Sequence, residues 1–174
     1  MSEALPPFEV EPLSDEHDRA AFRCGVDALD RYLANQASQD VRRRVAACFV
    51  AVEAGTRAIA GYYTIASSSL PLPDIAAATA KKLPRYPLVP AVRTGRLAVA
   101  EGHRGKGLGA ALLVDGITRA LRAEIIAFAV VVDAKDDAAT AFYRHHGFAA
   151  LTSAPMSLYL PLAEAARKLG IPTP

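Results

Sequence analysis

The alternation of apolar and polar side chains predicts strands in the first half of the chain. Residues 8–13 alternate and then meet a proline, which is typical of a short edge strand. Residues 47–53 and 59–69 are two further strand-like runs with Gly55 in the turn between them, so we expect an antiparallel hairpin. Residues 70–90 are rich in proline and alanine, and they predict a long excursion with a short helix near residues 76–83.

Two segments in the middle of the chain show helical spacing of apolar residues. Apolar side chains recur every three to four positions over residues 26–40, which predicts one amphipathic helix with Arg42, Arg43 and Arg44 just beyond its end. Residues 92–99 resume as a strand and lead through a glycine-rich turn at 101–107 into a second helix over 108–123.

The last third of the chain continues the strand–helix pattern. Residues 126–132 form a continuous apolar run, which is typical of a strand buried on both faces. A helix over 138–146 is expected to end at Gly147. Closing elements follow over 148–151, 156–160 and 162–170. We therefore expect an α/β (α+β) fold with a mixed central sheet flanked by helices, in a single domain over 1–174 with its core at 8–161.

Composition narrows the class of protein. The chain has 174 residues, 52% hydrophobic and 22% charged, which fits one globular domain. Its longest apolar run, residues 125–132, is far too short to span a bilayer, and residues 1–7 lack the pattern of a secretory signal. Cys24 and Cys48 form no disulfide framework and show no zinc-ligand spacing. We expect buried free thiols in a cytoplasmic protein without a metal.

The glycine-rich turn predicts a phosphate site. Gly105, Gly107 and Gly109 alternate at the start of a helix, where the backbone can come close to a ligand and the helix N-terminus favours an anion. The turn also satisfies the relaxed dinucleotide pattern through Gly105, Gly107 and Ala110, with Asp133 ending the next strand. Against a dinucleotide fold, the motif comes after residue 100 with little chain remaining. A nucleoside-triphosphate loop is excluded because no Gly-Lys-Ser/Thr closes the turn.

The same turn resembles the coenzyme A pyrophosphate motif of the GNAT acetyltransferase superfamily, R/Q-x-x-G-x-G/A, as Arg104, Gly107 and Gly109. The strand at 95–99 and the segment 136–148 also resemble that family. The resemblance implies acetyl-CoA as cosubstrate. It places the cosubstrate against Leu97, Ala98, Val99, Arg104, Gly105, Lys106, Gly107, Leu108, Gly109, Ala110, Asp136, Ala139 and Phe142.

The resemblance assigns catalysis to Tyr143, as the acid that protonates the departing thiolate. A phenol with a pKa near 10 is matched to an alkyl thiolate. A backbone N–H of residues 97–99 would polarise the thioester carbonyl. No carboxylate or histidine stands out as a general base, and an α-amine with a pKa near 8 needs little help. Asp136, where the family commonly has asparagine, is expected to cap the following helix.

A narrower resemblance covers nearly the whole chain. The segments 22–33, 39–40, 61–64, 83–90, 95–99 and 132–134 resemble the GNAT toxins of bacterial toxin–antitoxin pairs. The resemblance implies acetylation of aminoacyl-tRNA, a ribbon-helix-helix antitoxin as partner and a homodimer. The net charge is only +2, but basic residues concentrate in the first half of the chain. We expect phosphate contacts from Arg42, Arg43, Arg85 and Arg93.

Three other functions stay open at this point. The first is a housekeeping GNAT enzyme that acetylates a small amine or a protein amino terminus. The second is a non-catalytic module that binds coenzyme A or an antitoxin and regulates transcription. The third is a nicotinamide dinucleotide protein, which rests on the glycine pattern alone.

Overall fold

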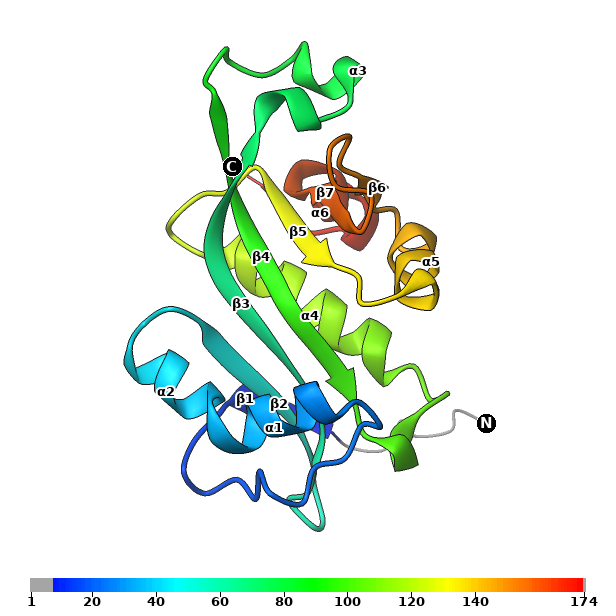
Figure 1. Ribbon diagram of the computed structural model, residues 1–174. Coiled ribbons are helices and arrows are strands. Elements are labelled where there is room, and N and C mark those ends of the chain that lie inside the picture. The colour runs from blue at the N-terminus through cyan, green and yellow to red at the C-terminus, as the bar shows by residue number, and fades with distance from the viewer. Residues whose placement is uncertain (1–7, 174) are drawn as a thin grey trace. The chain divides into compact units, whose positions relative to one another are not determined.

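A computed structural model describes residues 8–173, so the N-terminal segment 1–7, where no secretory signal is expected, lies outside the described residues. Seven strands form a mixed sheet in the order β1-β2-β3-β4-β5-β7-β6 (Figure 1). The neighbours β1/β2, β2/β3, β5/β7 and β6/β7 run antiparallel, and β4/β5 run parallel. The strands are β1 (Phe8–Pro12), β2 (Ala47–Glu53), β3 (Ile59–Pro71), β4 (Leu88–Val99), β5 (Ala129–Asp133), β6 (Ala149–Ala150) and β7 (Ser157–Pro161). The edge position of β1 and the β2–β3 hairpin confirm the sequence predictions.

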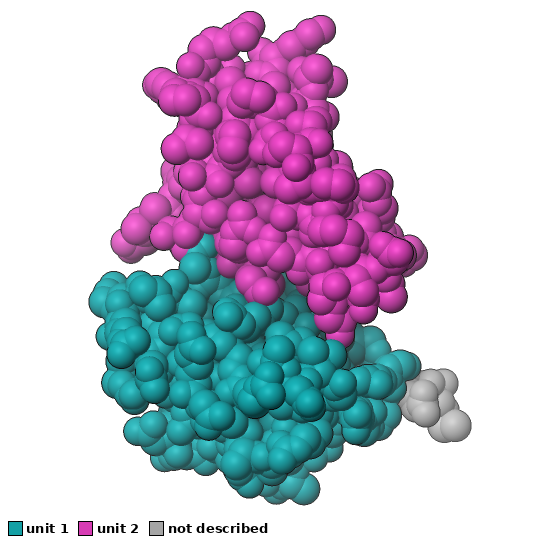
Figure 2. Space-filling model, in the orientation of Figure 1, with its two compact units in different colours: residues 1–66, 96–116 teal, residues 67–95, 117–174 magenta. Residues whose placement is uncertain are grey.

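Within residues 8–173, six α-helices accompany the sheet. They are α1 (Asp27–Asn35), α2 (Ala37–Arg42), α3 (Ala77–Ala80), α4 (Leu108–Arg122), α5 (Asp137–His145) and α6 (Leu162–Leu169), with 3-10 turns η1 (Leu72–Asp74) and η2 (Glu101–His103). The chain divides into two compact units, shown in Figure 2. Unit 1 comprises Met1–Ala66 and Arg96–Gly116, and unit 2 comprises Ser67–Gly95 and Ile117–Pro174.

Unit 1 has two apolar layers because alternate residues of a strand face opposite sides of the sheet. On one side, Val50 and Tyr62 pack with Leu33 and Ala37 from α1 and α2. Figure 1 shows these two short helices lying across the strands of the hairpin. On the other side, Tyr63 packs with Ala51, Ala60, Leu108 and Leu112, the last two from the first half of α4.

Unit 2 is built around β5 and β7. Val131 and Tyr159 on one face of these strands pack with Leu70 and Ile75 from the end of β3 and the excursion that follows it. The Tyr159 hydroxyl accepts a hydrogen bond from the Ala76 backbone N–H at 3.0 Å, which ties the excursion to the sheet. The predicted short helix of this excursion is the four-residue α3.

Two elements differ from the sequence prediction. The helix expected over 26–40 is divided at Gln36, whose φ of −123° departs from helical geometry. This break allows Ala37 to pack fully buried in the same cluster as Leu33. The strand expected from residue 126 begins at Ala129, and Ile125 and Ile126 are 87% and 77% exposed. Its pairing starts where Ala91 of β4 faces Ala129, so apolar character alone misplaced the start of this strand.

Candidate active site

The glycine-rich turn lies in unit 1, between the end of β4 and the start of α4. Gly105 and Gly107 have φ of +74° and +80°, in the left-handed region that glycine adopts without strain. A Cβ added at either position would meet no atom within 4 Å, so the turn has room for a ligand against its backbone. The prediction of glycines that serve backbone conformation therefore fits the geometry.

The start of α4 provides hydrogen-bond donors. The Ala111 N–H donates to the Gly107 carbonyl at 3.1 Å as the helix begins. The N–H groups of Leu108, Gly109 and Ala110 precede this bond and belong to the helix end that favours an anion. Lys106 is exposed in the same turn and adds a positive charge. These groups suit the pyrophosphate of a coenzyme.

Arg104 contacts a segment of unit 1 that is distant in the sequence. Its guanidinium donates a hydrogen bond to the Cys24 backbone carbonyl, in the loop before α1. Gly25 in that loop has a φ of +88°, and a Cβ there would lie 2.7 Å from the Arg104 guanidinium nitrogen. Arg104 thus connects the glycine-rich turn to a loop 80 residues earlier, in addition to any phosphate contact.

Glu53 and Phe8 hold the turn through His103, and the sequence reasoning missed these contacts. The His103 Nε2 lies 2.8 Å from a Glu53 carboxylate oxygen at the end of β2. The hydrogen bond from His103 is the main reason that the pKa of Glu53 is lowered. The Phe8 ring packs edge-on against His103, with ring centroids 5.5 Å apart. No local sequence signal links residues 50 positions apart.

The strand that enters the turn uses its side chains for packing. Ala98 is buried in the α1 side of unit 1, and Leu97 and Val99 pack on the α4 side. What this segment can offer a ligand is therefore its backbone, which is the role that the resemblance assigns to it.

Tyr143 lies in unit 2, near the end of α5. It is 6% exposed and packs against Phe142 and Phe148, with ring centroids 5.2 and 5.6 Å away. Burial, and secondarily the charge of Asp133, raise the pKa of Tyr143 to about 12. The phenol is therefore a weaker acid than its sequence context suggested, and it keeps its proton throughout the physiological pH range.

The first turn of α5 is held by Asp136. Its carboxylate accepts a hydrogen bond from the Ala139 N–H at 2.8 Å, so the predicted helix cap is confirmed. Phe142 also packs edge-on against His146, with centroids 4.7 Å apart. Asp136 and Ala139 are thus hydrogen-bonded to each other, and the Phe142 ring packs against the Tyr143 ring.

A polar network surrounds Asp133 at the end of β5. Arg93 donates to the Asp133 carboxylate at 2.5 Å, and Ser157 donates to the same oxygen at 2.9 Å. The Arg93 Nε also donates to the Ser68 hydroxyl at 3.4 Å. Arg93, expected to contact tRNA, thus forms an ion pair with Asp133, the carboxylate whose charge raises the pKa of Tyr143.

The other basic candidates lie on the surfaces of their own units. Arg42 ends α2, Arg43 follows it, and both are exposed. Arg85 is exposed and lines a mainly apolar pocket of about 370 Å³ with Leu72 and Ile75 in unit 2. The residues predicted for the site therefore divide between the units: the glycine turn and Arg42 in unit 1, Tyr143, Arg85 and Arg93 in unit 2.

Two features are absent from residues 8–173. No cluster of three or more histidine, cysteine, aspartate or glutamate side chains within this range is arranged to hold a metal. None of the helices in the same range is long and apolar enough to cross a membrane.

Comparison with known proteins gives the family. A model of the acetyltransferase (GNAT) domain matches residues 44–150. A "tRNA-acetylating toxin" of Mycobacterium tuberculosis is 33% identical over 160 residues, covering 91% of this chain and 94% of that protein. A "probable toxin TacT" of Sinorhizobium fredii is 32% identical over 167 residues, covering 88% of this chain and 91% of that protein.

Solved structures agree on the fold. AtaT complexed with acetyl-methionyl-tRNAfMet has a TM-score of 0.85 at 24% identity, covering 95% of this chain and 98% of AtaT. Mutant AtaT bound to the C-terminus of its antitoxin AtaR has a TM-score of 0.79 at 24% identity, covering 93% of this chain and 98% of that one. The chain belongs to the GNAT acetyltransferase family and is an acetyl-CoA-dependent N-acetyltransferase.

Proposed function

We propose that this enzyme acetylates the α-amine of aminoacyl-tRNA and so acts as a translation-blocking toxin. The observation that carries the proposal is the relative named a tRNA-acetylating toxin, which is 33% identical over 91% of this chain. The glycine turn and the buried Tyr143 are the two features of the structure that the proposed reaction uses.

The turn of unit 1 would hold the cosubstrate. Its open backbone at Gly105 and Gly107, the first N–H groups of α4 and the charge of Lys106 fit a pyrophosphate. Acetyl-CoA, when bound, supplies an acetyl group activated as a thioester. The backbone of residues 97–99 would orient this group and polarise its carbonyl.

Tyr143 would supply the proton that the departing sulfur needs. The new bond forms between the amine nitrogen and the acetyl carbon, the carbon–sulfur bond breaks, and the phenol O–H donates to the sulfur. An α-ammonium with a pKa near 8 is partly neutral at pH 7, because it loses a proton to solvent before attack. After the carbon–nitrogen bond has formed, the nitrogen loses a second proton to solvent, and the Tyr143 phenolate takes a proton back from solvent. The raised pKa of Tyr143 makes the phenol a weaker acid, so it would keep its proton until negative charge develops on the departing sulfur.

Several properties of the whole protein follow from this proposal. Residues 1–174 would form a single catalytic domain with its core at 8–161 and a C-terminal helix over 162–170. We infer a ribbon-helix-helix antitoxin as partner, a homodimer as the active assembly, and the cytoplasm, where charged tRNA is found, as the location. Arg42, Arg43 and Arg85 are offered as phosphate contacts because each side chain is exposed.

A second candidate function is acetylation of a small amine or a protein amino terminus. The small-amine enzyme would use the same turn and the same tyrosine, so the site chemistry does not separate the two acceptors. Only the nature of the acceptor distinguishes them.

The deciding experiment combines purified protein, radiolabelled acetyl-CoA and a charged total tRNA pool. Label on RNA with the charged pool, and none with the same pool after deacylation, would support the proposal and place the acetyl group on the aminoacyl amine. Absence of label on charged tRNA, with acetyl-CoA still bound by calorimetry, would reject it in favour of a small amine or protein acceptor.

A further inference from the structure

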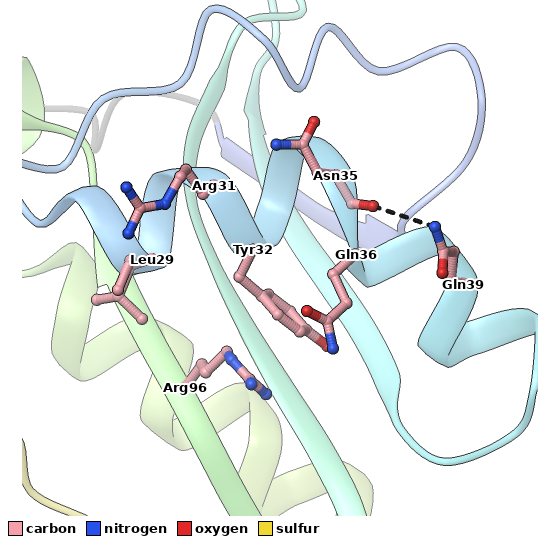
Figure 3. Close-up of a pocket in the computed structure, with 8 residues that line it drawn as sticks. Leu29, Arg31, Tyr32, Asn35, Gln36, Gln39 and Arg96 are labelled. Carbon is pink, nitrogen blue, oxygen red and sulfur yellow. Dashed lines mark hydrogen bonds between the residues drawn. The ribbon is translucent and has the colours of Figure 1, made fainter.

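Two pockets that include neither the glycine turn nor Tyr143 differ in their linings. The pocket beside α1 in unit 1, shown in Figure 3, is lined mainly by polar side chains, and the Arg96 guanidinium carbon there lies 3.5 Å from the centroid of the Tyr32 ring. The pocket of about 370 Å³ in unit 2 is formed by η1, α3 and the segment after α3, and we call it the α3 pocket. Its lining consists of five aliphatic residues and two cations: Leu72, Pro73, Ile75, Ala77, Ala80, Lys81 and Arg85.

Contacts within unit 2 hold the walls of the α3 pocket in place. The Leu72 N–H donates to the Pro87 carbonyl at 3.1 Å, which joins the start of the excursion to its end. The Thr152 hydroxyl donates to the Pro73 carbonyl at 3.2 Å. Ile75 is 3% exposed and packs in the apolar cluster of β5 and β7. The pocket is therefore formed before a ligand binds, which lowers the free-energy cost of binding.

The charge of the α3 pocket is positive. Lys81 and Arg85 are both exposed, and none of the residues that line the pocket is acidic. Asp74 lies between two lining residues in the sequence but does not line the pocket, and its carboxylate accepts a hydrogen bond from the Thr152 hydroxyl at 3.2 Å. Cations beside an aliphatic wall favour a ligand that has one anionic group and an apolar body.

The lining also indicates what the apolar body is. No aromatic side chain lines the pocket, so a nucleobase would find no ring on which to stack. The backbone N–H groups of Leu72, Ile75 and Ala80 already donate within unit 2. Pro73 has no N–H, so the main chain of a bound peptide would find few donors along this wall. An aliphatic chain needs no such donors.

We propose that the α3 pocket binds an aliphatic carboxylate of the fatty-acid type. Its hydrocarbon chain lies against the aliphatic wall and leaves water, which supplies most of the binding free energy, and its carboxylate lies at the cationic rim. The site shares no residue with the glycine turn, and the inference does not depend on which amine the enzyme acetylates. Because Arg85 is also offered as a tRNA contact, the test relies on Lys81 and Ala77.

The helical spacing of α3 supplies matched control variants. Ala77 and Lys81 are four positions apart and both line the pocket, whereas Ala78 and Lys82, one position later, do not. All four side chains are exposed, so substitutions there should have little effect on the free energy of unfolding. Thermal unfolding of each variant checks this expectation.

The test measures binding of octanoate to the full chain by calorimetry, with 1-octanol as the uncharged ligand of the same chain length. We expect Lys81→Glu to weaken octanoate binding about fivefold, because an exposed charge attraction is lost. Ala77→Phe should weaken it about tenfold, because the added ring takes the place of part of the bound chain. Ala78→Phe and Lys82→Glu should change the affinity less than about twofold, and wild type should bind 1-octanol about fivefold more weakly than octanoate.

Several outcomes would overturn the proposal. One is the absence of saturable octanoate binding, and another is an equal loss for both members of either matched pair, because the lining face of α3 would then not matter. Loss of octanoate binding when coenzyme A is added would place octanoate in the cosubstrate site instead. A peptide ending in leucine that binds through Ala77 about tenfold more tightly than octanoate would make the pocket a peptide site, and the proposal would be wrong.

Discussion

The two compact units differ in how they would contribute to the proposed acetyl transfer. In unit 1 the glycine-rich turn would act through its backbone, since Gly105 and Gly107 adopt positive φ and the first N–H groups of α4 would be the donors. In unit 2 the proposed catalytic group is one side chain, the phenol of Tyr143, whose pKa is raised to about 12 mainly by burial. We therefore expect cosubstrate binding at the turn of unit 1 to be sensitive to an added side chain. We expect catalysis in unit 2 to be sensitive to removal of the Tyr143 hydroxyl.

The contrast has a physical basis. An anion is bound well by N–H groups that need no side chain, and glycine is the residue that lets a ligand approach them. Proton donation needs an ionisable group held at one atom, and packing by Phe142 and Phe148 holds the Tyr143 ring. Five substitutions test this difference, in order of expected effect, with the last two as a pair.

Removal of the Tyr143 hydroxyl should have the largest effect. We expect Tyr143→Phe to lower kcat by about 10²–10⁴ because the departing sulfur loses its proton donor. Binding of acetyl-CoA, measured by calorimetry, should change little, since the ring remains in place. A kcat within threefold of wild type would remove Tyr143 from the catalytic role.

An added methyl group at Gly61 should destabilise unit 1. A Cβ there would lie 2.8 Å from Leu112 Cδ1 and 2.9 Å from the Ala98 carbonyl oxygen, so strand or helix must shift. We expect Gly61→Ala to lower the free energy of unfolding by about 1–3 kcal/mol in urea denaturation. Gly55→Ala is the control, since a Cβ at Gly55 meets nothing within 4 Å. Equal stabilities of the two variants would contradict the close packing.

Gly107→Ala should weaken cosubstrate binding and also lower the free energy of unfolding. Alanine at a φ of +80° costs about 1–2 kcal/mol, and the added methyl group stands on the open side of the turn. We expect acetyl-CoA to bind about tenfold more weakly, the equivalent of about 1.4 kcal/mol. Gly102→Ala in the same turn, where no positive φ is required, should bind as wild type does. Identical affinities for both variants would argue against the turn as the binding site.

Asp133→Asn should have the smallest effect, a shift in pH dependence. The negative charge of Asp133 disfavours the phenolate and so raises the pKa of Tyr143, although burial is the larger cause. Its removal should lower that pKa, and the alkaline limb of kcat should move to lower pH.

Arg93→Gln should shift the pH dependence of kcat in the opposite direction. It removes the cation that is 2.5 Å from the Asp133 carboxylate, so the negative charge would act on Tyr143 more strongly. We expect the alkaline limb to move to higher pH. A shift in the same direction for both variants would mean that the network acts through structure rather than charge.

Much of this molecule could be read from local patterns. The hairpin of β2 and β3, the helix after the glycine turn and the Asp136 cap all depend on residues within a few positions of one another. The family resemblance also depends on linear motifs, and the comparisons confirm it. Such features are accessible to sequence because hydrophobic period and capping are short-range effects.

Other features required the folded chain. The break at Gln36 depends on how Ala37 packs, and the exposure of Ile125 and Ile126 depends on where β4 offers a pairing partner. The bond from Arg104 to Cys24 and the contact of Arg96 with the Tyr32 ring join segments far apart in sequence.

The sequence by itself therefore determined the family, the order of most elements and the residues of the glycine turn. The tertiary structure decided that Arg93 pairs with Asp133, that Arg96 stacks on Tyr32 and that burial raises the pKa of Tyr143. The reason is that burial and charge pairing arise from residues brought together by folding, and no local pattern encodes those distances.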